Sequence, residues 1–123
     1  MTTDTALLAR VTAALDRVVD PCSVGRGVPA GLVDMGMVKS VAILDADAGP
    51  RADILLRTTS PGCHLQVWFT ERVVDEVAAA TGIRDVHVDW STEFDWSDDD
   101  MSDSLKARLR AKREGAKRDR AVR

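Results

Sequence analysis

Residues 52–90 read ADILLRTTSPGCHLQVWFTERVVDEVAAATGIRDVHVDW, and this stretch predicts a strand, a helix and a second strand in succession. Apolar and polar side chains alternate along residues 52–58 and again along 84–90, as they do in half-buried strands. Residues 65–81 carry apolar side chains at helical spacing, and Gly82 suits the left-handed position that closes a helix.

Two further elements precede this stretch. Residues 4–19 have the apolar spacing of an amphipathic helix, and Asp20-Pro21 is expected to end it because the residue before a proline avoids the helical conformation. Residues 38–45 read as a strand, joined to the next strand by a turn-rich connector that predicts a hairpin. Residues 22–31 contain three glycines and a proline and predict a long loop, which in a small domain is often functional.

The order helix, strand, strand, helix, strand predicts an α/β protein of the two-layer α+β kind. We expect a small mixed sheet with both helices on one face. Residues 1–102 are expected to form a single domain, because a chain of 123 residues fits one compact core. Residues 103–123 are expected to follow as a basic tail, helical at first and frayed beyond Lys112.

Composition bears on where the protein is located and on the state of its cysteines. No apolar run approaches the ~20 residues that a membrane helix requires, so no membrane association is expected. The first residues lack the basic start and apolar stretch of a secretory signal, which predicts a cytoplasmic protein. Two cysteines do not make a disulfide framework, so each is a buried apolar side chain, a reactive thiol or a metal ligand.

Charge is distributed very unevenly along the chain. Residues 1–102 hold eight Lys and Arg against seventeen Asp and Glu, a net charge of −9, whereas residues 103–123 hold nine against three, a net charge of +6. The tail has no aromatic residue for stacking on bases and is attached to an acidic domain, which argues against nucleic-acid recognition. A solubilising or protein-docking tail is the interpretation that we favour.

Cys63 is the leading candidate for a functional residue. It follows a Pro-Gly turn and opens the helix at 65–81, where unpaired N–H groups and the helix dipole stabilise a thiolate. Thr58 and Thr59 add hydroxyl donors, and His64 is available as a ligand or proton acceptor. In the alternative interpretation Thr59 or Ser60 merely caps the helix and Cys63 points inward.

Four sequence motifs occur in a characteristic order. They are Asp20-Pro21, VDMGMV at 33–38, TTSPGC at 58–63, and Trp96-Ser97 followed by Met101-Ser102. With them the chain resembles the iron–sulfur cluster assembly proteins that include the bacterial SufT and PaaD proteins and the eukaryotic cytosolic iron–sulfur targeting factor. The resemblance covers about residues 7–109.

The resemblance implies an accessory factor and not an enzyme. Its role would be to assemble or deliver an iron–sulfur cluster or another metallocentre to a client iron–sulfur or di-iron protein, together with assembly machinery. Cys63 would be the reactive cysteine, with Asp20, Asp34, Thr58 and Thr59 around it. Iron or a cluster would be bound only transiently, since a thiolate is the soft ligand that iron and sulfide prefer but the acidic site is shallow.

The chain departs from the family pattern at two places. Cys22 stands where the family has Glu after Asp-Pro, and His64 stands where it often has Pro. We hypothesise a three-ligand metal site of Cys22, Cys63 and His64; in the alternative, Cys22 packs under its loop as a small apolar residue. Two subunits that share a cluster through Cys63 would form a homodimer.

Two other function classes stay open at this point. In the first, the chain is a thiol enzyme with Cys63 as nucleophile and His64 or His87 as base. In the second, it is an adaptor of a multicomponent metal-dependent oxygenase system, and its cysteine is structural.

Overall fold

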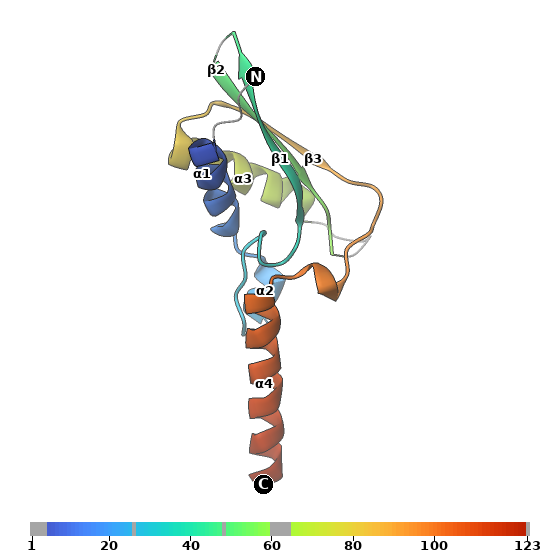
Figure 1. Ribbon diagram of the computed structural model, residues 1–123. Coiled ribbons are helices and arrows are strands. Elements are labelled where there is room, and N and C mark those ends of the chain that lie inside the picture. Colours follow the sequence, from blue (N-terminus) through green and yellow to red (C-terminus); the bar gives the residue numbers. More distant parts are fainter. Residues whose placement is uncertain (1–4, 26, 48, 60–64, 123) are drawn as a thin grey trace.

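A computed structural model describes residues 5–25, 27–47, 49–59 and 65–122 (Figure 1). Helices and strands follow in the order α1 (Thr5–Asp16), α2 (Pro21–Gly25), β1 (Val38–Ala46), β2 (Gly49–Leu56), α3 (Gln66–Thr81), β3 (Asp85–Trp90), the single 3-10 turn η1 (Asp98–Asp100) and α4 (Asp103–Val122). The predicted fold class is confirmed: this is a small α+β protein built on a mixed sheet.

The sheet has the strand order β1-β2-β3. β1 and β2 form the predicted antiparallel hairpin, and β3 pairs with β2 in parallel after the crossover through α3. The hairpin is tighter than expected, because Gly49 and Pro50 pair with Ala46 and Asp45 and therefore belong to β2 and not to a loop. A proline is tolerated at this end of the strand, where its missing N–H interrupts little of the ladder.

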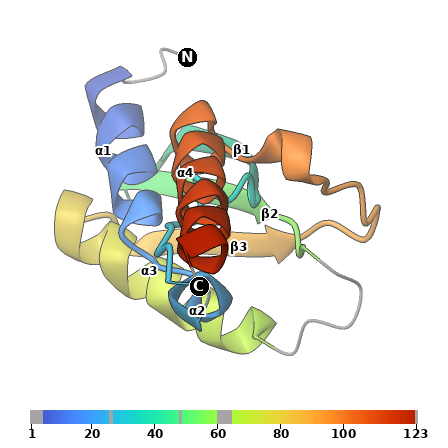
Figure 2. The same cartoon turned by 90° about the horizontal axis from the view of Figure 1, so that it is seen from below.

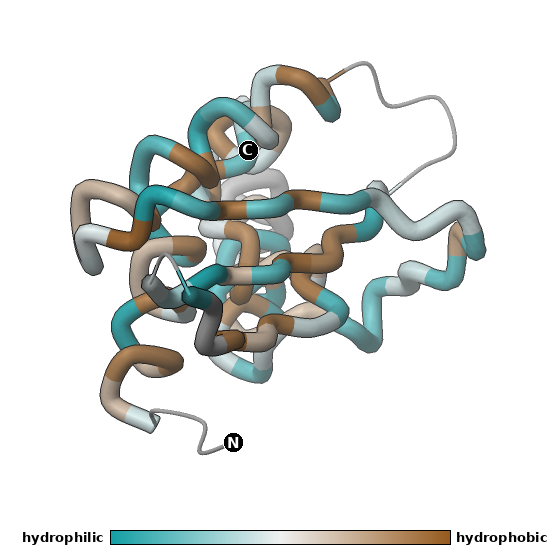
Figure 3. The backbone as a smooth tube through the Cα atoms, turned by 90° about the horizontal axis from the view of Figure 1, so that it is seen from above, coloured by the Kyte–Doolittle hydropathy of each residue, from teal (hydrophilic) through white to brown (hydrophobic). Residues whose placement is uncertain are grey.

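The helices cover one face of the sheet. α1 packs against α3 and β1, and α3 packs against β3, while α4 lies in front of the sheet when it is seen from below (Figure 2). Seen from above, the strands are in front and hydrophilic residues alternate with hydrophobic ones along them (Figure 3). The core forms where the apolar sides of these elements meet: Val11, Ala14 and Leu15 of α1, Ala52, Ile54 and Leu56 of β2, and Phe69, Val73 and Val77 of α3 are buried.

β3 presents its two faces as the alternation predicted. Val86, Val88 and Trp90 pack against the core, whereas His87 is exposed on the other face and lies 2.6 Å from the Asp85 carboxylate. The indole Nε1–H of Trp90 donates to Thr70 Oγ1 of α3 over 3.0 Å. This bond satisfies the polar atom of a largely apolar ring and fixes α3 against the strand.

The segment between α1 and β1 differs from the prediction. α1 ends at Asp16, and the chain then turns back, so that the N–H of Asp20 donates to the Ala30 carbonyl over 2.9 Å. The expected loop at 22–31 contains the short helix α2. Pro21 occupies the first helical position, where a proline costs no hydrogen bond, and buried Ser23 accepts from the Ala30 N–H over 2.9 Å.

α4 continues as a helix to Val122, which agrees with the helical alternative for the basic tail. Ser102 begins it: the Ser102 hydroxyl accepts from the N–H of Leu105 over 3.1 Å. Leu105 is fully buried in the core cluster, so the first turn is held by packing as well as by its cap. Figure 1 shows the rest of α4 extending away from the sheet and the other helices.

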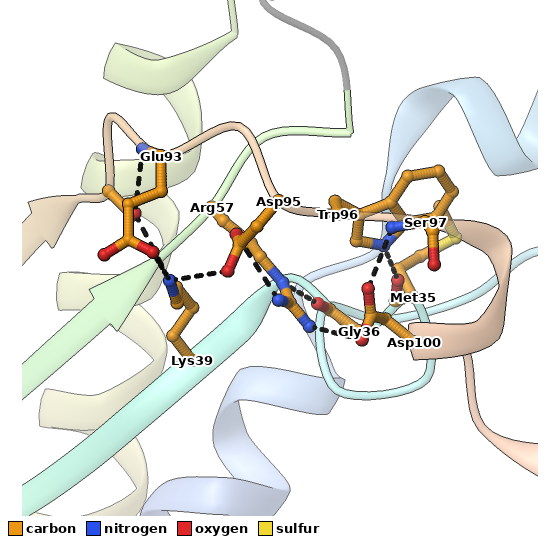
Figure 4. A network of polar contacts seen from close by, with 10 residues as sticks. Met35, Gly36, Lys39, Arg57, Glu93, Asp95, Trp96, Ser97 and Asp100 are labelled. Carbon is orange, nitrogen blue, oxygen red and sulfur yellow. Dashed lines mark hydrogen bonds and ion pairs between the residues drawn. The ribbon is translucent and has the colours of Figure 1, made fainter.

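An ionic network ties the segment after β3 to the sheet (Figure 4). Arg57 donates through Nε to the Gly36 carbonyl over 2.8 Å and pairs with Asp100 at 3.0 Å and Asp95 at 3.5 Å. Lys39 lies 2.9 Å from Asp95, and this hydrogen bond lowers the pKa of the Asp95 carboxyl and raises that of Lys39. The Trp96 indole N–H donates to the Met35 carbonyl over 2.6 Å, so it holds the segment after β3 against the loop before β1.

Candidate functional site

Asp20 and Cys22 lie at the start of α2. Asp20 is buried, with 5 % of its surface exposed, and its Oδ1 accepts from the N–H of Cys22 over 3.1 Å. The carboxylate thereby satisfies an otherwise unpaired N–H of the first helical turn. Cys22 itself is exposed, which does not fit the alternative that buries its side chain under the loop. A thiol at this position is open to solvent and to a partner.

Thr58 follows the end of β2 and leads toward Cys63. Only 3 % of its surface is exposed, and Oγ1 is the buried side-chain polar atom that has no hydrogen-bond partner in the described part of the chain. An unpaired buried hydroxyl costs about 1–3 kcal/mol. Native proteins rarely keep such a group without a use, and a ligand, ion or water is the usual explanation.

Cys63 and His64 lie outside the described residues, between Thr59 and Leu65. α3 begins at Gln66 with Leu65 at its N-cap, so the alternative in which Thr59 or Ser60 caps this helix is wrong. The helix also begins three residues later than Cys63, and a thiolate held by its first turn stays a prediction. Within the four described ranges, no three His, Cys, Asp or Glu side chains gather as a metal site, a finding that leaves Cys63 and His64 untested.

The Asp34 side chain contacts the start of α4, whereas its N–H donates to Asp16 Oδ1 of α1 over 3.1 Å. Asp34 Oδ1 accepts from the Ser102 hydroxyl over 2.8 Å, its Oδ2 lies 3.3 Å from Arg108 Nη2, and its carbonyl accepts from the Ser102 N–H over 2.8 Å. The carboxylate therefore holds the start of α4. Sequence reasoning missed Ser102 and Arg108 in this role, although a serine three residues before a buried leucine is a helix-start signal.

Comparison with known proteins assigns the chain to a family. The family model described as iron–sulfur cluster assembly protein matches residues 8–90, which is more than half of the chain. The chain belongs to this family. No curated protein matches it.

Solved structures support the family fold. A domain of unknown function from Bacillus anthracis matches with a TM-score of 0.71 and 25 % identity, over 85 % of this chain and 92 % of that one. A Mycobacterium tuberculosis protein, described as associated with Fe–S complex assembly and repair, matches with a TM-score of 0.52 and 27 % identity, over 90 % and 92 %. A conserved hypothetical protein from Thermotoga maritima, at 22 % identity with a TM-score of 0.60 over 82 % and 91 %, shares the fold.

The family match begins in α1 and ends with β3. It contains every site residue proposed from the sequence, from Asp20 to His64. η1 and α4 lie beyond the matched residues, so they add a feature that the family model does not describe. Among the described helices, none combines the length and the apolar character needed to cross a membrane.

Proposed function

We propose that this protein is an accessory factor that delivers an iron–sulfur cluster, or iron for another metallocentre, to a client metalloprotein. Family membership supports a role associated with iron–sulfur cluster assembly, and the Mycobacterium tuberculosis relative is described in the same terms. The client is an iron–sulfur or di-iron protein, and the chain performs no catalytic step of its own. A cytoplasmic location and a dimer that shares one cluster through two Cys63 thiolates belong to this proposal.

The unpaired hydroxyl of Thr58 is the observation that carries the proposal. It is a buried donor two residues after the end of β2, and Thr58 is the first residue of TTSPGC. A sulfide or thiolate sulfur next to Cys63 would accept a hydrogen bond from the Thr58 hydroxyl. That bond would remove the free-energy cost of burying the hydroxyl without a partner. Among the described residues no group takes this hydrogen bond, which leaves the Thr58 hydroxyl available to a ligand.

The proposed ligands suit a cargo that has to leave again. Thiolates of Cys63 and Cys22 are soft ligands for iron, and His64 adds an imidazole of intermediate character. Three protein ligands leave a tetrahedral iron one position that a thiolate of the client can occupy. Transfer then proceeds by exchange of ligands without a change in oxidation state. The exposure of Cys22 on α2 supports its proposed role as a ligand that a client can reach.

Replacing Cys63 with serine is expected to abolish binding of the cargo. After anaerobic reconstitution with ferrous iron and sulfide, the wild type should show sulfur-to-iron charge-transfer absorbance and protein-bound iron, and Cys63→Ser should show neither. Cys22→Ser should weaken iron binding at least about tenfold, because even partners outside the ligand shell contribute that much.

Val24→Ser is the matched control, since Val24 is exposed on the same short helix but is not a ligand. Unchanged absorbance in Cys63→Ser would overturn the proposal. Unchanged iron affinity in Cys22→Ser would remove Cys22 from the site and leave Cys63 in place. Alkylation of Cys63 at neutral pH without any uptake of iron would favour the thiol enzyme instead.

Thr58→Val separates a role in binding from a role in stability. Valine has nearly the same shape and lacks the unpaired hydroxyl, so the free energy of unfolding of the apo protein should stay equal or rise by about 1 kcal/mol. Iron and sulfide binding should weaken in the same variant, as titration followed by absorbance would measure. A loss of stability with unchanged binding would show that the hydroxyl serves the fold.

A further inference from the structure

α4 is the most strongly charged element of the molecule and lies outside the family-matched residues. The segment 103–123 has a net charge of +6, whereas residues 1–102 have a net charge of −9. Figure 1 shows this helix projecting from the end of the domain at which α2 lies. An acidic partner is therefore repelled by most of the surface and attracted to one helix.

The base of α4 is held rigidly enough to present a defined surface. Leu105 is fully buried, and Arg108 donates to the Pro29 carbonyl over 2.9 Å in addition to its contact with Asp34. The ammonium group of Lys112 lies against Gly27, where a side chain on Gly27 would overlap it. Pro29 and Gly27 both belong to the segment that directly follows α2.

A groove runs along α4 beside this base. It has a volume of about 380 Å³ and is lined by three apolar residues (Met101, Leu109 and Ala116) and three charged ones (Asp98, Lys112 and Arg113). Met101 is 8 % exposed and Leu109 is only partly buried, so part of the apolar lining is accessible to solvent. Linings that combine apolar and charged residues are typical of surfaces that bind an amphipathic segment.

We propose that this groove docks an acidic, amphipathic segment of a partner protein. Apolar side chains of the segment would enter between Leu109 and Ala116, and its carboxylates would meet Arg113 and the other cations of α4. Guanidinium groups bind carboxylates through two parallel hydrogen bonds, which gives register as well as attraction. The apolar lining and the absence of aromatic residues from 103–123 favour a protein segment over a nucleic acid.

Docking at this place would hold the partner near the segment that follows α2, the helix that carries the exposed Cys22. Lys112 contacts Gly27, and Gly27 lies five residues after the exposed Cys22 on α2. A client held on α4 would therefore lie at the end of the domain that carries α2. The inference goes beyond the proposed function, because docking itself needs neither cysteine nor iron.

The test measures binding of a fluorescent peptide of Glu and Leu at helical spacing to the full chain by anisotropy. Arg113→Glu is expected to weaken binding at least about tenfold, and Leu109→Ser by a similar factor. Arg110→Glu is the matched control: it makes the same charge change at an exposed position of α4 that does not line the groove, and a loss below about threefold is expected.

Three results would overturn the inference. These are equal losses in Arg113→Glu and Arg110→Glu, tighter binding of single-stranded DNA than of the acidic peptide, or equal binding of the same peptide with Lys in place of Glu. Repeating the titration in the Cys22→Ser, Cys63→Ser double variant keeps the two proposals apart. Peptide affinity should not change there, although uptake of iron should be lost.

Discussion

Replacing Gly36 with alanine is expected to lower the free energy of unfolding by about 2–5 kcal/mol. Gly36 has a φ of +73°, a left-handed conformation that costs other residues about 1–2 kcal/mol. A Cβ at this position would also overlap the backbone carbonyl of Asp100. That backbone cannot yield freely, because Arg57 ties Asp100 to the Gly36 carbonyl. Urea unfolding followed by tryptophan fluorescence measures the loss.

Two other glycines serve as controls that separate the backbone strain at Gly36 from the steric overlap with Asp100. Gly82 has a φ of +77°, and no atom of the described residues lies within 4 Å of the place that an alanine methyl would take. Gly82→Ala should therefore lower the free energy of unfolding only by the backbone strain, about 1 kcal/mol. Gly115 lies within α4 with open space beside it, and Gly115→Ala should stabilise the protein by about 0.5–1 kcal/mol. A Gly36→Ala variant no less stable than Gly82→Ala would show that the close approach to Asp100 is unimportant.

Leu105→Ala is expected to cost about 2–5 kcal/mol, the usual range for truncation of a fully buried leucine. Leu105 is the apolar side chain by which the first turn of α4 joins the core, so the variant should also lose helical content. Far-ultraviolet circular dichroism and urea unfolding would measure the two effects. Docking of the acidic peptide should weaken with them, because the groove depends on a fixed helix.

Leu109→Ala is the natural control for this prediction. Leu109 lies one turn further along α4 and is only partly buried, so a cost of about 1 kcal/mol is expected. Equal losses at the two positions would contradict the view that α4 is anchored by its first turn. A large loss of stability without any loss of helical content would contradict the link between packing and helix formation.

The sheet and its two covering helices could be predicted because their signals are local. Val86, Val88 and Trp90 alternate with polar residues, and the structure places all three against the core. α3 shows apolar side chains at helical spacing and ends at Gly82, which has the left-handed φ that the pattern required. Such patterns reflect burial directly, so no knowledge of distant contacts was needed.

The features that were missed depend on contacts between distant residues. α2 is stabilised by a cap from Asp20 and by buried Ser23, which bonds to Ala30 across a turn rich in glycine. The Asp34 carboxylate contacts Ser102 and Arg108, which are 68 and 74 residues away, and these contacts were not predicted. Neither partner carries a local signal that identifies Asp34. The expectation that Asp34 lies near Cys63 stays a prediction, because Cys63 lies outside the described residues.

Arg57 has a consequence for where this domain ends. Its guanidinium group joins Gly36, inside the family-matched residues, to Asp95 and Asp100 beyond them, and only 14 % of its side chain is exposed. A chain cut after Trp90 would leave the Arg57 guanidinium largely buried without the Asp95 and Asp100 carboxylates that pair with it. The same cut would expose the core residues that Met101 and Leu105 cover. The smallest autonomous folding unit is thus longer than the family-matched segment.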